Sequence, residues 1–528
     1  MLFLAAWAVL ASGPAWGAGV RDVPLVNWSY LPGSRDWLYD AVEKVVDSGL
    51  AGPAILNIKP MTRREMARIV LRAVDRIRKD PDNNHNDRKD MEGLLMALIE
   101  EFRPELRALG FHHDVTEGPE PGFWSFRILD QAQMNVLAAG EDGQLQNQEG
   151  KSFRSGGNVW LALNSWAEAG DYGALYANPE FYGSGEDARF RLVEGYARLG
   201  IANVDVTAGR EAIWWGPGYH GSMWFSSNAQ PPWMFQVRSR EAFELPGFLR
   251  PLGQFKLIFH LMQLDKDQVF PRPYVTSARL SWAPFSFVEL GFGRSVTFGG
   301  QGRQKPVRGE DFPRIFFTAT DEAPNTSRVK SDSRGALDAT FRFHDVDRFF
   351  PLTKDIELYG SLQIDDTRGS PAFIPNQPGY QVGVYMPNFL GNARADARVE
   401  YAYSSPISFT NALYSSGFEY KGFPLAHFIG TGGRDLYLRT SYWVNERIQV
   451  ANEVSYSRIR STEYLLAPQI EETLFMAGPE VSYSYSKDLR FRLGIQMWHA
   501  QNLDLVPGRD RTFPVFQIGV RYDFGGRN

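Results

Sequence analysis

The sequence predicts a mainly β fold, a transmembrane antiparallel β-barrel of about 18 strands that follows a small N-terminal α-helical bundle. Two observations lead to this fold class. Apolar and polar side chains alternate along roughly the last 400 residues, and short connections alternate with long ones between the strand-like segments. A soluble sandwich also buries an apolar face. The length over which the alternation persists favours a barrel with an apolar outside and a hydrated lumen.

The last strand shows the alternation most clearly. Its even positions are apolar or aromatic: Phe516, Ile518, Val520, Tyr522 and Phe524. Its odd positions are polar or glycine: Gln517, Gly519, Arg521 and Asp523. A period of two places these sets on opposite faces of a strand. The residues Gln517, Gly519, Tyr522 and Phe524 also resemble the C-terminal signal that the outer-membrane barrel assembly machinery reads. We therefore expect membrane lipid and that machinery as partners.

Other segments repeat the pattern, with mostly charged or polar residues at every second position in 337–344, 394–403 and 489–498. Such rows of charge do not fit a dry core, whereas a hydrated lumen accommodates them. We expect tight turns at Gly170-Asp171, Ala283-Pro284, Asn445-Glu446 and Lys487-Asp488, and long loops at 299–335 and 366–378. About seventeen to nineteen strands can be counted, and because bacterial barrels favour even numbers we predict eighteen.

Composition limits the function. The 528 residues carry a net charge of −5, which gives no support to nucleic-acid binding. The chain has no cysteine, so disulfides, thiolate metal sites and cysteine nucleophiles are excluded. Aromatic residues make up 14% of the chain, as the aromatic girdles of a membrane barrel require.

Four segments are expected along the chain. Residues 1–17 resemble a secretory signal peptide with small residues Ala15 and Gly17 before the cleavage point; the alternative is a buried apolar strand or helix. Residues 18–113 have helical periodicity and predict a periplasmic α-helical bundle, with a capping box from Thr62 to Glu65. Residues 114–122 form a linker, and 123–528 form the outer-membrane barrel. The bundle could plug the barrel mouth, flank it, or face a partner.

The densest group of unusual residues runs from Gly209 to Gln230 and contains Trp214-Trp215-Gly216-Pro217-Gly218-Tyr219-His220. Together with 271–274, 289–293, 298–300 and 378–387, it resembles the capsule-assembly Wzi family of outer-membrane proteins. The resemblance extends over roughly residues 123 to 524. It implies an eighteen-stranded barrel in the bacterial outer membrane that acts as a polysaccharide-binding lectin. Such a protein attaches or organises capsular or related extracellular polysaccharide at the cell surface.

The residues of this group suit a sugar ligand. Indole and phenol rings can pack on sugar faces, and the Arg210 guanidinium can bind a carboxylate or phosphate in a fork. A Gly-Pro-Gly turn can bring backbone donors close to a ligand. The candidate ligand-binding residues are Arg210, Glu211, Trp214, Trp215, Tyr219, His220, Trp224 and Asn228. The alternative is that the tryptophans anchor the membrane girdle or fill the lumen.

Two other functions compete with a lectin. A barrel of eighteen strands is wide enough for a porin or polysaccharide export channel, which steady conductance would reveal. An outer-membrane hydrolase could use Glu211, His220 and Ser222, but proximity in sequence does not establish triad geometry. His112-His113-Asp114 belongs more naturally to a linker than to a metal site, and Asp365-Asp366 to a solvated loop. We therefore expect no catalytic residue, no metal and no cofactor.

Overall fold

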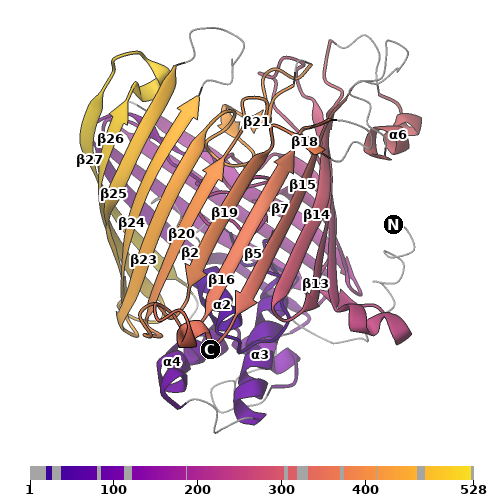
Figure 1. The fold of residues 1–528 in the computed structure, drawn as a ribbon, viewed down its shortest axis with the longest axis vertical. Coiled ribbons are helices and arrows are strands. Elements are labelled where there is room, and N and C mark those ends of the chain that lie inside the picture. Colours follow the sequence, from indigo (N-terminus) through magenta and orange to yellow (C-terminus); the bar gives the residue numbers. More distant parts are fainter. Residues whose placement is uncertain are drawn as a thin grey trace.

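The computed structural model has a closed barrel with a group of helices at one end (Figure 1). It describes residues 20–25, 37–79, 85–111, 122–185, 187–302, 307–317, 331–368, 374–411, 413–460 and 470–524. The expected signal peptide, His112-His113-Asp114 and residues 114–121 of the expected linker lie outside these ranges. Among the described residues, no helix combines the length and the apolar character needed to cross a bilayer.

The helices near the N-terminus follow the predicted pattern. The helices are α2 (Trp37–Asp47), α3 (Arg63–Lys79), α4 (His85–Glu101), α5 (Arg103–Ala108) and, in a later loop, α6 (Phe312–Phe317). Thr62 caps α3, because its hydroxyl accepts the Glu65 amide at 3.1 Å. The Glu65 carboxylate binds Lys256 of the barrel wall at 2.6 Å. The predicted capping pair therefore also ties the bundle to the barrel.

Eighteen antiparallel strands close the barrel in the described part of the chain, because β27 pairs with β2. In wall order they are β2 (Trp124–Ala139), β5 (Gly156–Ala169), β6 (Gly173–Ser184), β7 (Ala188–Ile201), β8 (Val204–Arg210), β10 (Trp233–Ser239), β12 (Gln254–Gln263), β13 (Tyr274–Phe285), β14 (Val288–Phe298), β15 (Ser331–Phe343), β16 (Ile356–Ile364), β19 (Gly379–Met386), β20 (Ala395–Tyr403), β23 (Arg434–Asn445), β24 (Ile448–Arg460), β25 (Glu471–Ser484), β26 (Leu489–Gln501) and β27 (Arg511–Asp523). The two-residue β11 (Phe243–Glu244) pairs with β12 and continues the wall position of β10. The predicted strand number is confirmed.

Short strand pairs and turns of 3-10 helix lie in the connections. The pairs are β1 (Ile58–Lys59) with β9 (Trp214–Trp215), β3 (Gly143–Gln144) with β4 (Ser152–Phe153), β17 (Asp366–Arg368) with β18 (Ile374–Asn376), and β21 (Glu419–Tyr420) with β22 (Phe423–Pro424). The 3-10 helices are η2 (Gly247–Leu252), η3 (Gly309–Asp311), η4 (Val346–Arg348) and η5 (Leu503–Leu505). Of these pairs, β1–β9 alone joins the N-terminal region to a barrel connection.

The two faces of the wall differ as the alternation predicts. In β27, Phe516 is 48% exposed on the outer face, whereas Gln517 is 3% exposed on the lumen side. Exposed aromatic side chains gather where the connections are shortest: Trp124, Tyr172, Phe287, Phe343, Tyr442, Tyr485 and Phe524. This distribution is typical of the aromatic belt at a membrane–water interface.

One expected turn is wrong. Ala283-Pro284 lies at the end of β13, where the register shifts between Trp282 and Phe285, and the chain turns at 286–287 instead. Proline cannot donate to a strand ladder, so a bulge at a strand end accommodates it. Pro284 therefore lies in the last residues of the strand, two residues before the turn that it was expected to form.

The barrel has a helix end and a loop end. At the helix end most connections are short, and the bundle contacts them through Arg64 with Asp171 and Lys487 with Glu100. At the loop end lie the long connections 211–232, 299–330 and 404–433. Helices α2, α3 and α4 appear at the lower end of the barrel in Figure 1, and β18 and β21 at the opposite end.

Protein fills much of the described lumen. Helix α2 enters the barrel mouth, where Asp47 accepts from Arg342 at 2.8 Å and Glu43 pairs with Arg398 at 2.9 Å. These arginines are the lumen-facing charges of β15 and β20. The lumen-facing arginines that predicted a hydrated lumen therefore pair with carboxylates of α2, and the bundle closes the helix end of the barrel.

Candidate functional site

The group of unusual residues occupies the connection between β8 and β10, which we name the inner segment (211–232). Every residue of the inner segment is buried. Its strand β9 pairs with β1, placing Trp215 opposite Ile58 and Trp214 opposite Lys59. The segment therefore turns from the wall into the lumen and meets the N-terminal region there.

Glu211 begins the inner segment and is held by the wall. Both carboxylate oxygens accept from Arg198 of β7, at 2.6 and 2.9 Å. Arg198 also binds Asp22 at 2.8 Å and donates to the Val20 carbonyl at 2.9 Å. One buried guanidinium therefore joins the N-terminal stretch, the wall and the inner segment.

The two adjacent tryptophans lie on opposite sides of the β1–β9 pair. Trp214 packs in the core of the helical bundle, and its indole donates to the Gly218 carbonyl at 3.1 Å. Trp215 is 0% exposed and meets Trp224 and Phe225 edge to face, each with 5.1 Å between ring centroids. Trp215 thus packs inside the lumen with Trp224, whereas Trp214 packs against the helical bundle.

The Gly-Pro-Gly turn aims backbone donors at a wall carboxylate. The amides of Tyr219 and His220 donate to Glu400 of β20 at 2.7 and 3.0 Å. Gly218 has no room for a side chain, because a Cβ there would lie 2.1 Å from the Gly221 carbonyl and 2.3 Å from Gln381. The backbone amides that the sequence analysis assigned to a ligand therefore donate to a carboxylate of the protein itself.

The remaining members of the group are also bound within the barrel. The Tyr219 hydroxyl donates to Asp40 of α2 at 3.2 Å, and His220 Nδ1 lies 2.7 Å from Asp435. The Trp224 indole donates to Ser295 at 2.7 Å, and the Asn228 amide group to the Pro424 carbonyl at 3.2 Å. The three residues of the hydrolase alternative have separate partners, since the Ser222 hydroxyl donates to the Trp215 carbonyl. The structure brings seven candidates into one buried segment and leaves Arg210 at its edge.

Arg210 lies in a different environment, at the loop-end tip of β8. Strands β8 and β10 have seven residues each, and β8 pairs only with residues 195–201 of the fourteen-residue β7. The wall is therefore low at these two strands. Arg191 lies on the part of β7 above β8, and Lys421 lies at the turn of the β21–β22 hairpin. We name these three cations the basic notch (Arg191, Arg210 and Lys421).

The two arginines of the basic notch lie close enough to Lys421 to affect its ammonium group. Burial, together with repulsion by Arg210 and Arg191, lowers the pKa of the Lys421 ammonium. The Arg210 guanidinium lies 5.0 Å from the ring centre of Trp233, and its Nε is buried without a hydrogen-bond partner among the described residues. The Lys421 ammonium donates to Gln230 at 2.9 Å and lies 5.4 Å from the Tyr420 ring centre. Clustered cations beside aromatic rings can hold a bound anion in a fork.

Sequence reasoning found Arg210 but missed Arg191 and Lys421. Arg191 is one of many alternating charges in a strand, and Lys421 lies in a long loop without a periodic pattern. The available signal was the Tyr420-Lys421-Gly422 triplet, which is typical of a tight turn that presents its central side chain.

Carboxylates also gather inside the lumen. Ligand oxygens of Glu43, Asp47 and Glu357 lie within 4.8 Å of one another, but Arg342 binds Asp47 and Glu357 while Arg398 binds Glu43. Burial, and then the Glu357 carboxylate, raise the pKa of Asp47 well above its usual range, against the opposing Arg342. This cluster is an ion-pair network between α2 and the wall.

The raised pKa makes α2 sensitive to pH. A folded-state pKa above the unfolded one means that the folded protein binds more protons, so stability falls as pH rises from the usual carboxyl pKa towards the raised one. We expect Asp47→Asn to remove this loss, since the amide oxygen can still accept from Arg342. The stability of α2 at each pH is measured as its opening free energy by hydrogen exchange at pH 5 and pH 9, corrected for intrinsic exchange rates. Equal pH dependence in both proteins would contradict the assignment.

An eighteen-stranded closed barrel with a lipid-compatible outer face and an aromatic belt defines the class of bacterial outer-membrane barrel proteins. The family described as capsule assembly protein Wzi matches residues 131–514, and the chain belongs to this family. Its location is the bacterial outer membrane.

Individual proteins agree with this assignment. The solved structure described as Wzi, an outer-membrane protein involved in group 1 capsule assembly in Escherichia coli and a carbohydrate-binding β-barrel, covers 96% of this chain and 100% of its own, with TM-score 0.69 and 16% identity. An uncharacterised 55.8 kDa protein from the cps region of Klebsiella pneumoniae is 24% identical over 234 residues, or 44% of this chain and 42% of that protein. The match with that relative therefore spans less than half of either chain. Pseudomonas aeruginosa OprD reaches TM-score 0.44 at 10% identity, which is too distant to carry an argument.

Proposed function

We propose that this protein binds polysaccharide at the cell surface, and attaches or organises capsular or related extracellular polysaccharide there. The helix end would face the periplasm and the loop end the outside, since short turns are periplasmic in bacterial barrels. Family membership supports the function, and the carbohydrate binding described for the Escherichia coli protein points the same way. The plugged lumen argues against a wide channel.

The observation that carries the proposal is the basic notch at the loop end. Two guanidinium groups and one ammonium group lie together beside Trp233 and Tyr420. An acidic polymer supplies carboxylates for the cations and ring faces for the aromatic side chains. We assign the direct contact to Arg210 and Lys421. Arg191 lies near Lys421 but pairs with Glu180 at 2.9 Å and donates to the Glu149 carbonyl at 3.1 Å. The seven buried candidates would then position the edge of the site from beneath.

Charge reversal in the notch tests this function. We expect the double variant Arg210→Glu, Lys421→Glu to bind polygalacturonate at least about 100-fold more weakly, because two charge-assisted contacts of about 1.5–3 kcal/mol each are lost. Biolayer interferometry with the detergent-solubilised protein measures the affinity. Binding by the wild type should weaken as salt rises, because exposed charges are screened.

Arg509→Glu is the matched control, because that loop-end arginine already pairs with Glu141 and Asp504 at 3.0 and 2.6 Å. It should retain nearly all of the affinity. Equal losses in the control and the double variant would indicate a general charge effect and remove the notch as the site.

A further inference from the structure

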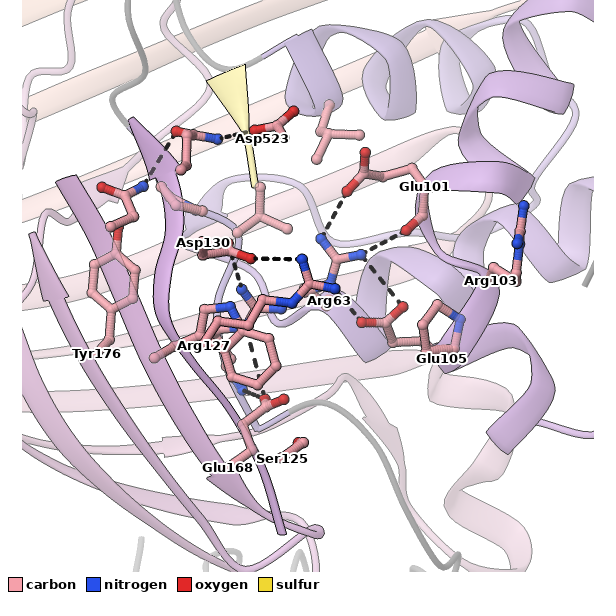
Figure 2. A pocket seen from close by; sticks show the side chains of 18 of the residues that line it. Arg63, Glu101, Arg103, Glu105, Ser125, Arg127, Asp130, Glu168, Tyr176 and Asp523 are labelled. Atoms are coloured by element: carbon pink, nitrogen blue, oxygen red, sulfur yellow. Dashed lines mark hydrogen bonds and ion pairs between the residues drawn. The ribbon is translucent and has the colours of Figure 1, made fainter. Parts of the chain in front are cut away.

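A second candidate site lies at the helix end, far from the notch along the barrel. A cavity of about 240 Å³ separates the bundle from strands β2, β5, β6 and β27. Its volume corresponds to roughly eight water molecules at about 30 Å³ each, which is the scale of a small solute. Figure 2 shows Arg63 between Glu101 and Glu105 on the helix side, with Tyr176 on the barrel side.

A break in the wall shapes the cavity. The register between β2 and β5 shifts between Arg127 and Gln131. As a result Asp130 and Gln131, adjacent in sequence, both line the cavity. Bulges of this kind redirect side chains and are common beside binding sites.

The charges around the cavity are paired and nearly balanced. Five arginines and six carboxylates line it. Asp130 lies 3.6 Å from Arg21 and 3.5 Å from Arg127, and Arg63 pairs with Glu101 at 2.9 Å. A charged ligand of either sign would have to break one of these pairs. A hydroxyl group both donates and accepts, so it can bind an arginine and a carboxylate together.

Two buried polar groups of the lining lack a partner. The Tyr176 hydroxyl and the Trp166 indole N–H have no hydrogen-bond partner among the described residues. Tyr176 itself is buried, and its ring stacks on Tyr196 at 5.4 Å, which fixes the hydroxyl. Buried polar groups without partners are unfavourable, so a ligand that bonds them gains affinity. Gln131 and Asn164 also line the cavity. Gln131 donates to Asp523 at 2.7 Å and accepts from Asn164 at 3.3 Å, and each amide group can make further hydrogen bonds.

We infer that this cavity binds a neutral saccharide, one or two sugar units long, through paired arginine and carboxylate side chains, amides and the Tyr176 hydroxyl. The inference does not depend on the basic notch, which is at the other end of the barrel and suits an acidic polymer. The protein would then contact glycan on both sides of the membrane. A sugar held between bundle and wall would also stabilise the docked bundle.

Ligand-observed saturation-transfer NMR tests the inference on the full-length protein in detergent. The probes are neutral disaccharides of glucose, galactose, mannose and N-acetylglucosamine, with galacturonic acid and putrescine as charged comparisons. In the double notch variant, which lacks the site proposed for acidic polymer, we expect at least one neutral disaccharide to bind more tightly than either charged probe. Tyr176→Phe removes only the hydroxyl and should weaken binding about 3- to 10-fold, as expected for one hydrogen bond. Ser125→Trp fills the cavity and should abolish the signal.

The controls separate this site from the rest of the protein. Tyr172→Phe changes an exposed tyrosine at the same end and should leave disaccharide binding unchanged, as should the double notch variant. Four results would overturn the inference: no neutral disaccharide binds, a charged probe binds the double notch variant more tightly, the signal survives Ser125→Trp, or Tyr176→Phe binds like the wild type. If Ser125→Trp does not fold, Tyr176→Phe decides alone. Failure here with intact polygalacturonate binding would leave the proposed function standing.

Discussion

Trp215→Ala is expected to loosen the inner segment without opening the barrel. The ring is fully buried among Trp224, Phe225 and the surrounding lumen cluster, so its removal leaves a large cavity. Replacing a buried tryptophan with alanine costs about 3–5 kcal/mol. The opening free energy of residues 211–232, measured by hydrogen exchange, should fall by that amount. The heat-modifiable gel shift of the barrel should persist, because the eighteen-stranded wall does not use this side chain for pairing.

Trp124→Ala is the control for this result. Trp124 is 74% exposed on the outer face of β2, and its ring contacts Phe123 at 5.3 Å between centroids. We expect no change in the exchange of the inner segment. If Trp215→Ala abolished polygalacturonate binding while the exchange of 211–232 stayed normal, Trp215 would be a ligand contact, and its assignment as a lumen-filling residue would be wrong.

The wall of the barrel was predictable because its signal is local. Each strand alternates by itself, so Phe516 and Gln517 could be assigned to opposite faces without knowledge of their neighbours. The helical bundle could also be predicted, because the capping residue Thr62 and the apolar spacing in α3 are patterns that extend over only one or two helical turns. Strand number followed from counting these independent segments.

The inner segment was not predictable in the same way. It has no period, and its partners Ile58, Glu400 and Asp435 come from distant parts of the chain. The residue types that suit a sugar also suit a buried packing cluster, so composition could not distinguish the two. Burial, and partners within the protein for most of the polar groups, distinguish a packing cluster from a sugar site; the Trp215 indole N–H and His220 Nε2 are buried without a partner among the described residues. The assignments of Gln517, Gly519, Tyr522 and Phe524 to barrel assembly and of the eight residues to ligand binding stay predictions.

The same argument explains the lumen charges. Alternating arginines correctly indicated an enclosed polar face, but the sequence did not reveal that α2 and the N-terminal stretch supply their counter-charges. Arg198 is the clearest case, because it binds Glu211, Asp22 and the Val20 carbonyl at once. An isolated strand pattern predicts a charge that faces inward. Only the packed structure shows that three separated segments converge on it.

Arg198→Met is therefore expected to release the N-terminal stretch and the start of the inner segment together. Removing one partner of a buried ion pair costs about 3–5 kcal/mol, since the carboxylates of Glu211 and Asp22 lose a charge partner. Hydrogen exchange of residues 20–25 and 211–216 should increase in both stretches. The double variant Arg198→Met, Glu211→Gln should regain part of the loss, because one uncompensated charge is gone. Arg250→Met removes an arginine that pairs with Glu244 at 2.9 Å but whose side chain is 77% exposed, and it should change neither stretch. Exchange that increased in only one stretch would show that Arg198 does not couple them. An increase confined to 211–216 would mean that Arg238, which also binds Asp22, holds the N-terminal stretch without Arg198.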